Sequence, residues 1–321
     1  MSDLWLYSII FVVSLGVLVK ASDIFTDAAD RIGVAIGLPP FIVGVTIVSV
    51  GTSVPELLSS IIAVLRDSAE IVVGNVVGSN IVNICLVIGV TSLINAKSLR
   101  VTYDLLSVDL PLFAGSAFLF ALMCSDQRIS TGEAFLLLIG YVVYFFYIFK
   151  GGSNEQQPDP DESSEITVDQ SPAFFIRQLL ILAISSALLF CGAKYTIDSL
   201  IELSQILNVG KELIAVSAVA FGTSIPELMV SANSAMKGKA EIAIGNVLGS
   251  NIFNIFVVVG IPGLLREIPV PGLVMQLGIP TMIAASILMF FSAQDRKVTV
   301  WEGWLFLMAY AWFLGQMFQI I

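Results

Sequence analysis

The chain has 321 residues, of which 57% are hydrophobic and only 12% are charged, with a mean hydropathy of +0.93 and a formal net charge of −10. A soluble domain carries about 25% charged residues, so this chain has too little polar surface to be a soluble globule, and we expect an integral membrane protein. It contains no histidine, which excludes His-ligated metals and Ser-His-Asp catalysis, and no basic cluster that would indicate nucleic-acid binding.

Ten apolar segments are predicted to cross the membrane as helices, because continuous apolar runs of about 17–25 residues match the thickness of a bilayer. A transmembrane β-barrel would instead alternate apolar and polar residues. We expect the first segment, from Leu4, to be a retained helix, since it lacks the basic region and cleavage site of a signal peptide. In chain order the segments are 4–22, 40–65, 71–94, 104–123, 131–149, 173–193, 212–236, 242–265, 273–291 and 300–319.

A polar linker, residues 150–172, divides these segments five and five. It is rich in acidic, Gly, Ser and Pro residues, and from 151 onward it has no Lys or Arg, so it is predicted to be a solvated loop between a first repeat, 1–149, and a second repeat, 173–321. Ten Lys or Arg residues fall in the loops on the linker side and five on the other side. The positive-inside rule then places the N-terminus outside and the linker in the cytoplasm of a cell (plasma) membrane protein.

An internal repeat relates the two halves. Residues 51–84 match residues 222–255 at a constant offset of 171, with 19 of 34 positions identical. The matched motifs are GTSVPEL and GTSIPEL, followed by GNVVGSNIVNI and GNVLGSNIFNI. Because each half has an odd number of crossings, the second copy is predicted to be inverted in the membrane. The expected fold is therefore an all-α membrane protein with ten transmembrane helices in two inverted five-helix repeats.

Each repeat carries one glutamate inside an apolar segment, Glu56 and Glu227. A carboxylate at mid-bilayer costs about 2.5–3.5 kcal/mol or more and therefore normally has a partner. A structural glutamate would pair with Lys or Arg, but neither segment has a basic residue at that depth. We interpret the missing partner as a bound cation.

Polar side chains and prolines surround each glutamate. Ser49, Thr52 and Ser53 lie on the helical face of Glu56, and Thr223 and Ser224 repeat the pattern. Pro55 and Pro226 each precede the glutamate, and a proline inside a helix leaves the carbonyl four residues earlier without its N–H partner. Freed carbonyls at this depth are tolerated where they line a cavity.

A second motif supplies an opposite wall. Asn75, Ser79 and Asn83 recur every four residues and share a face, and their counterparts are Asn246, Ser250 and Asn254. The structural alternative is that they only join helices by hydrogen bonds. The glycines of the same motif form GxxxG pairs and are expected to pack helices rather than bind ions. All candidate ligands are hard oxygens, which suit Ca²⁺, Na⁺ or Mg²⁺.

These motifs resemble the two alpha repeats of the sodium/calcium exchanger superfamily, and the length resembles its compact prokaryotic members. The resemblance implies alternating access in which Ca²⁺ and Na⁺ compete for one cluster. It implies Glu56 and Glu227 as central carboxylates, backbone carbonyls of Thr52 and Thr223 as Ca²⁺ ligands, and Asn83 as a central polar group. It also implies flanking Na⁺ sites at Ser49, Ser79, Ala220 and Ser250, through carbonyls at Ser49 and Ala220, with Ser53 and Ser224 nearby.

One position departs from the family. Well-studied sodium/calcium exchangers resemble each other in having aspartate where this chain has Asn254, so two carboxylates remain instead of three. The leading hypothesis is a Ca²⁺/Na⁺ antiporter that works as a monomer in the bilayer, with no cofactor beyond the transported ions. A Ca²⁺/H⁺ or K⁺-dependent exchanger is an alternative, and a passive cation channel is an alternative of another class. An intramembrane hydrolase is disfavoured because no nucleophile–base pair is visible.

Overall fold

The structure of the protein is a computed structural model that describes residues 2–94, 98–151, 170–207 and 222–318 and is predominantly helical. Eight of the described helices are long and apolar enough to cross a membrane. Helices suit this environment because lipid offers no hydrogen bonds to the backbone. The prediction of a mostly helical membrane protein is confirmed, whereas the count of ten transmembrane helices remains a prediction.

The first half contains two composite helices. The pieces α2, η1 and α3 run together over Pro40–Leu65, and α4, η2 and α5 run together over Glu70–Ile94. The segments η1 and η2 are π-helical, and η3 is a short 3₁₀ turn. The elements are α1 (Ser2–Ile36), α2 (Pro40–Val43), η1 (Gly44–Val48), α3 (Ser49–Leu65), α4 (Glu70–Ile81), η2 (Val82–Val87), α5 (Ile88–Ile94), β1 (Leu99–Arg100), α6 (Asp109–Met123), η3 (Cys124–Asp126), β2 (Arg128–Ile129) and α7 (Thr131–Gly151).

The second half also contains a composite helix with a π-helical segment. The pieces α11, η4 and α12 form one segment, Ala240–Leu265, and its most apolar stretch is entirely buried, so it lies at the centre of the bundle. The segments η4 and η5 are π-helical. The elements are α8 (Pro172–Leu207), α10 (Ile225–Met236), α11 (Ala240–Phe253), η4 (Asn254–Val258), α12 (Gly260–Leu265), β3 (Ile268–Pro269), η5 (Val274–Gly278), α13 (Ile279–Ala293), β4 (Lys297–Val298) and α14 (Val300–Met317).

Two predicted segments were too short. The first was expected to end at 22 and the sixth at 193, where charged residues begin, but α1 continues to Ile36 and α8 to Leu207. The continuation of α1 buries Phe25, Ala29 and Ile32, so one face of the helix remains apolar while its acidic residues lie on another.

The predicted seventh segment, 212–236, is described only in part. Residues 208–221 lie outside the described part of the chain, and α10 has 12 residues, Ile225–Met236. Pro226 therefore lies in the first turn of α10 rather than inside a helix, in contrast to the prediction. A proline fits this position because the first turn has no intrahelical partner for its N–H.

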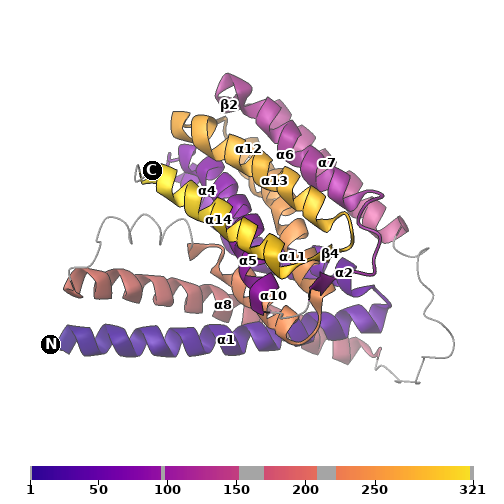
Figure 1. The fold of residues 1–321 in the computed structure, drawn as a ribbon, viewed down its shortest axis with the longest axis vertical. Helices are drawn as coiled ribbons and strands as arrows, with labels where there is room; N and C mark the ends of the chain where they lie inside the picture. Colours follow the sequence, from indigo (N-terminus) through magenta and orange to yellow (C-terminus); the bar gives the residue numbers. More distant parts are fainter. Residues whose placement is uncertain (1, 95–97, 152–169, 208–221, 319–321) are drawn as a thin grey trace.

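The helices form a bundle with two unlike edges (Figure 1). The long helices α1 and α8 lie side by side along one edge and contact each other more extensively than any other pair of helices described. Helices α6 and α7 lie on the opposite side, and α11 lies between, in contact with α6 as well as with α10, which touches α1. The central helices are thus shielded on both sides by apolar neighbours.

Two short antiparallel pairings join the halves. In the first, β1 pairs with β4 and places Leu99 opposite Val298. In the second, β2 pairs with β3 and places Ile129 opposite Ile268. Each pairing takes one strand from the first half and one from the second, so the two halves are interlocked rather than lying as separate domains.

Close helix approach occurs where a glycine permits it. A methyl group on Gly44 would lie 2.6 Å from the carbonyl oxygen of Ile242 on α11, and one on Gly249 would lie 2.5 Å from a backbone oxygen of η1. This packing confirms the expected role of the second-half GxxxG pair. Among the described residues, Gly74 and Gly78 make no comparable approach.

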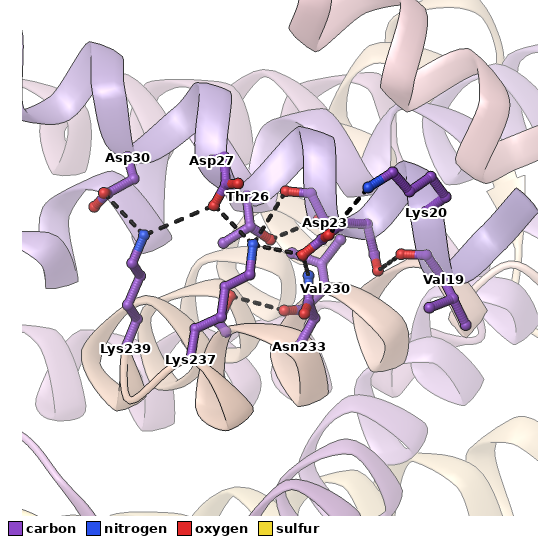
Figure 2. A network of polar contacts seen from close by, with 12 residues as sticks. Val19, Lys20, Asp23, Thr26, Asp27, Asp30, Val230, Asn233, Lys237 and Lys239 are labelled. Carbon is purple, nitrogen blue, oxygen red and sulfur yellow. Dashed lines mark hydrogen bonds and ion pairs between the residues drawn. The ribbon is translucent and has the colours of Figure 1, made fainter.

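An ion-pair network joins α1 to the turn between α10 and α11 (Figure 2). The Nζ atom of Lys237 lies 2.6 Å from Asp23 Oδ1 and 2.7 Å from Asp27 Oδ1, and Nζ of Lys239 lies 2.9 Å from Asp30 Oδ2. Burial opposes the charge of Lys237, but the hydrogen bonds that its ammonium donates to Asp23 and Asp27 raise its pKa above the usual value. The network gives the acidic residues in the continuation of α1 basic partners.

The network should show measurable coupling. Asp27→Asn and Lys237→Gln, made singly and together, are expected to give a coupling free energy of about 0.2–1 kcal/mol, because both side chains are partly exposed. Thermal unfolding of the purified protein in detergent gives this value, and the coupling should fall as salt is added. Strictly additive effects at low salt would show that the pair does not contribute.

Candidate cation site

Glu56 and Glu227 occupy the centre of the bundle, and both are 0% exposed. Glu56 lies on α3, and Glu227 lies in the first turn of α10. The walls are completed by α4 with η2 and by α11 with η4, which contact one another and the two glutamate helices. Four segments, two from each half, therefore converge on the carboxylates.

A hydrogen bond shows how near the two carboxylates are. Ser53 Oγ donates to Glu227 Oε1 across 3.1 Å, and Ser53 lies three residues before Glu56 on the same helix. Three residues rise only about 4.5 Å along a helix, so the carboxylates are close enough to repel each other. Among the described residues, neither forms an ion pair with Lys or Arg.

The site is rich in buried oxygens without a donor. Of nine buried side-chain N or O atoms that lack a hydrogen-bond partner in the described part of the chain, six are oxygens of predicted site residues. Buried polar atoms are normally paired, so this concentration of acceptors indicates a missing electropositive group. The six atoms are Glu56 Oε1 and Oε2, Glu227 Oε2, Asn83 Oδ1, Asn254 Oδ1 and Ser224 Oγ.

Four asparagines form the floor of the site. Asn83 Nδ2 donates to Asn251 Oδ1 across 3.3 Å, and Asn254 Nδ2 donates to Asn80 Oδ1 across 3.1 Å. The two bonds are equivalent under the offset of 171, since 80 corresponds to 251 and 83 to 254. Because the amide NH₂ groups of Asn83 and Asn254 are engaged, their side-chain oxygens are the atoms left free.

Hydroxyl groups flank the carboxylates on two sides. On one side, Thr52 Oγ1 donates to Asn246 Oδ1 across 3.2 Å, and Ser250 Oγ donates to the same oxygen across 3.4 Å. Thr52 Oγ1 also lies 3.3 Å from the backbone oxygen of Ser49, a carbonyl expected to contribute to a flanking site. These contacts bring Ser49, Thr52 and Ser250 together as predicted.

The other flank is built from the equivalent residues. Thr223 Oγ1 lies 3.3 Å from Ser79 Oγ and 3.4 Å from Asn75 Oδ1. Ala220, which was predicted to contribute a carbonyl here, lies outside the described residues. The other eleven predicted site residues lie on the four converging segments or, for Thr223 and Ser224, in the turn that immediately precedes α10.

Backbone irregularity coincides with the site. Asn83 lies in the π-helical segment η2, and Asn254 begins the π-helical segment η4. A π-helical turn inside an α-helix often marks a functional position. The sequence motif placed these asparagines on one helical face but gave no sign of the local widening.

The Gly51 carbonyl, which loses its backbone N–H partner because of Pro55, is hydrogen-bonded to a side chain of another helix. Helix α3 runs continuously through Pro55, and the carbonyl oxygen of Gly51, four residues earlier, accepts a hydrogen bond of 2.8 Å from Ser186 Oγ on α8. This carbonyl is therefore not a free ligand. The proline prediction was right about the lost N–H partner, but only tertiary structure shows that α8 replaces it.

Three contributing residues escaped the sequence analysis: Asn80, Asn251 and Ser186. A signal existed for the two asparagines, because both repeats contain Gly-Ser-Asn at equivalent positions. No comparable signal exists for Ser186, since it is one of several serines on α8 and its role depends on the path of α3.

The arrangement can bind a hard cation. Among the described residues, no group of three or more Asp, Glu, Cys or His side chains comes together, so the negative charge of the site is that of two glutamates. Carboxylate, amide and hydroxyl oxygens are the ligands that Ca²⁺ and Na⁺ accept in irregular cages.

Comparison with known proteins shows that this chain is similar to sodium/calcium exchangers. The family model described as sodium/calcium exchanger protein matches residues 6–150 and 177–319. The sodium/calcium exchanger MaX1 of Methanosarcina acetivorans is 33% identical over 97% of this chain and 98% of its own length, and the putative antiporter CaxA of Alkalimonas amylolytica is 31% identical over 94% and 96%. A solved structure of the sodium-calcium exchanger NCX_Mj superimposes with a TM-score of 0.81 and 27% identity, covering 98% of this chain and 99% of that one.

Removing the substitute partner of Gly51 should destabilise the protein. Ser186→Ala leaves the part-buried Gly51 carbonyl unpaired beside an apolar cavity of about 700 Å³, so we expect a loss of about 1 kcal/mol, at the lower end of the cost of an unpaired buried acceptor. The measurement is thermal unfolding in detergent.

A matched control is Ser116→Ala on α6. Its hydroxyl donates to the Phe113 carbonyl of its own helix, which keeps its backbone partner, so a smaller loss is expected. Equal losses in the two variants would contradict the role given to Ser186.

Proposed function

The chain belongs to the sodium/calcium exchanger family, and from that membership we propose that it is a secondary active antiporter that exchanges Ca²⁺ for Na⁺ at the site of Glu56 and Glu227. Its relatives include proteins named as sodium/calcium exchangers. The proposal concerns transport and not catalysis, and it assigns the ions as transported substrates rather than resident cofactors.

One observation carries this function: six buried oxygens of the site lack a hydrogen-bond partner among the described residues, and neither glutamate forms an ion pair there with Lys or Arg. Two carboxylates in a low-dielectric interior are very unfavourable without compensation. One Ca²⁺ or two Na⁺ would neutralise them, so the two ions compete for the same charge. An empty site with two bare carboxylates would resist reorientation, which is the physical basis for obligatory exchange.

The proposed ligand roles follow the positions of the oxygens. Glu56 would bind through both oxygens, because neither has another partner, whereas Glu227 has one oxygen engaged by Ser53. The free amide oxygens of Asn83 and Asn254 face the same region. We assign backbone carbonyls of Thr52 and Thr223 to Ca²⁺ and the two flanks, with Ser49, Ser79, Ala220 and Ser250, to Na⁺; Ser53 and Ser224 lie alongside.

Alternating access by inverted repeats is part of the proposal. Contacts occur in pairs related by the offset of 171: Thr52 with Asn246 and Thr223 with Asn75, or the two asparagine bonds across the floor. These pairs support a two-fold relationship between repeats 1–149 and 173–321, with the site near the bilayer midplane. In such folds one repeat or bundle rocks against the other around the site.

The orientation in the membrane is proposed from charge alone. Ten Lys or Arg residues against five place the N-terminus outside and the 150–172 linker in the cytoplasm of a cell membrane protein. The ion site is complete within one chain apart from Ala220, which supports function as a monomer.

Asn254 favours a second candidate within transport. An asparagine adds one carbonyl oxygen but no charge, so exchange of one Ca²⁺ for two monovalent ions would be electrically silent. Coupling to H⁺ or to K⁺ is the alternative, and a passive channel would need no counter-ion at all.

Flux in reconstituted vesicles distinguishes these candidates. Outward-directed Na⁺ gradients should drive Ca²⁺ uptake, whereas matched K⁺ or pH gradients should not. Uptake that follows the pH gradient and ignores Na⁺ would replace the proposal by H⁺ exchange. Dissipative Ca²⁺ flux without any counter-ion gradient would indicate a channel.

Neutralising either glutamate should abolish exchange. Glu56→Gln and Glu227→Gln each remove half of the negative charge while preserving shape, so Ca²⁺ uptake should fall to the vesicle background with the protein still folded. Glu302→Gln is the matched control, because Glu302 only caps α14 and glutamine also serves in capping boxes. Normal uptake by both site variants would remove the site assignment.

A further inference from the structure

Asn80 and Asn251 are buried beside the site, each with 1% of its surface exposed. Their side-chain oxygens already accept a hydrogen bond each: Asn80 Oδ1 accepts from Asn254 Nδ2, and Asn251 Oδ1 accepts from Asn83 Nδ2. They therefore contact the predicted ligands instead of the central space. A role for them must act through Asn83 and Asn254.

We propose that Asn80 and Asn251 are positioning residues that hold the amides of Asn254 and Asn83 with the oxygen toward the cation. The proposal rests on the cation site proposed above and adds two residues that no ligand assignment includes. It also states their role, which is to determine whether the oxygen or the NH₂ group of each ligand amide faces the ion.

The physical need for positioning comes from the amide group itself. An asparagine side chain ends in an acceptor oxygen and a donor NH₂ of similar size and shape. A half-turn about its last bond exchanges the two, and an NH₂ facing Ca²⁺ would repel it. Only the hydrogen-bond partners distinguish the two orientations, and here an acceptor oxygen faces each NH₂.

The positioning bonds also cross between the halves. Asn80 comes from the first half and orients Asn254 of the second, while Asn251 of the second half orients Asn83 of the first. The oxygens offered by each repeat thus depend on the other repeat being correctly placed. A relative shift of the repeats would release both amides together.

The two positioning residues are not used identically. Asn80 also donates through Nδ2 to the backbone oxygen of Asn251 at 3.3 Å and lies 3.8 Å from Met282 Sδ. Asn251 Nδ2, in contrast, has no partner among the described residues. Asn251 therefore acts through its oxygen alone, whereas Asn80 uses both ends of its amide.

This difference gives a test based on isosteric variants. Asn251→Leu removes the acceptor, and Asn251→Asp keeps an oxygen acceptor in the same place. Partners that orient metal ligands typically contribute about 10–100-fold to affinity, so Asn251→Leu should weaken Ca²⁺ binding by about tenfold or more. Asn251→Asp should stay closer to the parent. Asn80→Asp should not rescue in this way, because it loses the donor as well.

Two readouts on the full chain in detergent separate positioning from general stability. Equilibrium Ca²⁺ binding gives the affinity, and the unfolding temperature is measured with and without Ca²⁺, since a ligand that binds only the folded state stabilises it by RT ln(1 + [L]/Kd). For Asn251→Leu we expect a reduced Ca²⁺-dependent increase in the unfolding temperature and a nearly unchanged value without Ca²⁺.

The outcomes are distinguishable. Weak binding by Asn251→Leu with retention by Asn251→Asp supports the inference. Equal loss in both Asn251 variants, unchanged binding by Asn251→Leu, or a lowered Ca²⁺-free unfolding temperature that accounts for the whole loss would overturn it. Glu56→Gln is measured in parallel: normal Ca²⁺ binding by that variant would remove the proposed site itself, whereas loss there with normal Asn251→Leu removes only the positioning role.

Discussion

Burying a carboxylate away from water costs several kcal/mol unless a counter-charge compensates it, and this protein buries two within reach of each other. Glu56 and Glu227 are fully enclosed, and no lysine or arginine in the described part of the chain pairs with them. Ser53 satisfies one of the four carboxylate oxygens. The other three carboxylate oxygens have no partner among the described residues, and the proposed cation would supply the positive charge that compensates them.

The polar groups around the glutamates are held by contacts between the halves. Thr52 reaches Asn246, Ser53 reaches Glu227, and each floor asparagine reaches one from the other repeat. Close backbone packing at Gly44 and Gly249 brings η1 against α11, so that these short side chains can reach one another. A site assembled across two halves is sensitive to their relative position, which suits the exchange proposed above.

The peripheral helices α1 and α8 differ from the central helices in their contacts. Helices α1 and α8 pair with each other along one edge and present apolar side chains such as Trp5 and Ile184 outward. Their polar links to the centre in the described part of the chain include the ion pairs of Lys237 and Lys239 with the acidic face of α1 and the hydrogen bond from Ser186 to the Gly51 carbonyl. These links provide ionic or hydrogen-bond partners for the aspartates of α1 and for the Gly51 carbonyl, which lipid could not provide. Charged residues and an unpaired carbonyl are therefore tolerated without a continuous polar interface.

The sequence alone determined the membrane class, the internal repeat and a set of candidate cation-binding residues, because an acidic residue in an apolar segment and its copy 171 residues later are visible in one dimension. It also determined that Pro55 deprives Gly51 of a partner. It could not give the true ends of α1 and α8, since the lysines that pair with Asp23 and Asp30 come from more than 200 positions away.

Tertiary structure decided which polar atoms remain free. The motif predicts Asn83 as a ligand but does not show which of its amide atoms is free, and only the hydrogen bond from Asn83 Nδ2 to Asn251 shows that the oxygen of Asn83 has no partner, whereas the oxygen of Asn80 accepts from Asn254. The same holds for Gly51, whose released carbonyl is taken by Ser186. The physical reason is that residue type fixes what an atom can bind, whereas its availability depends on neighbours that the fold brings from the other half of the chain.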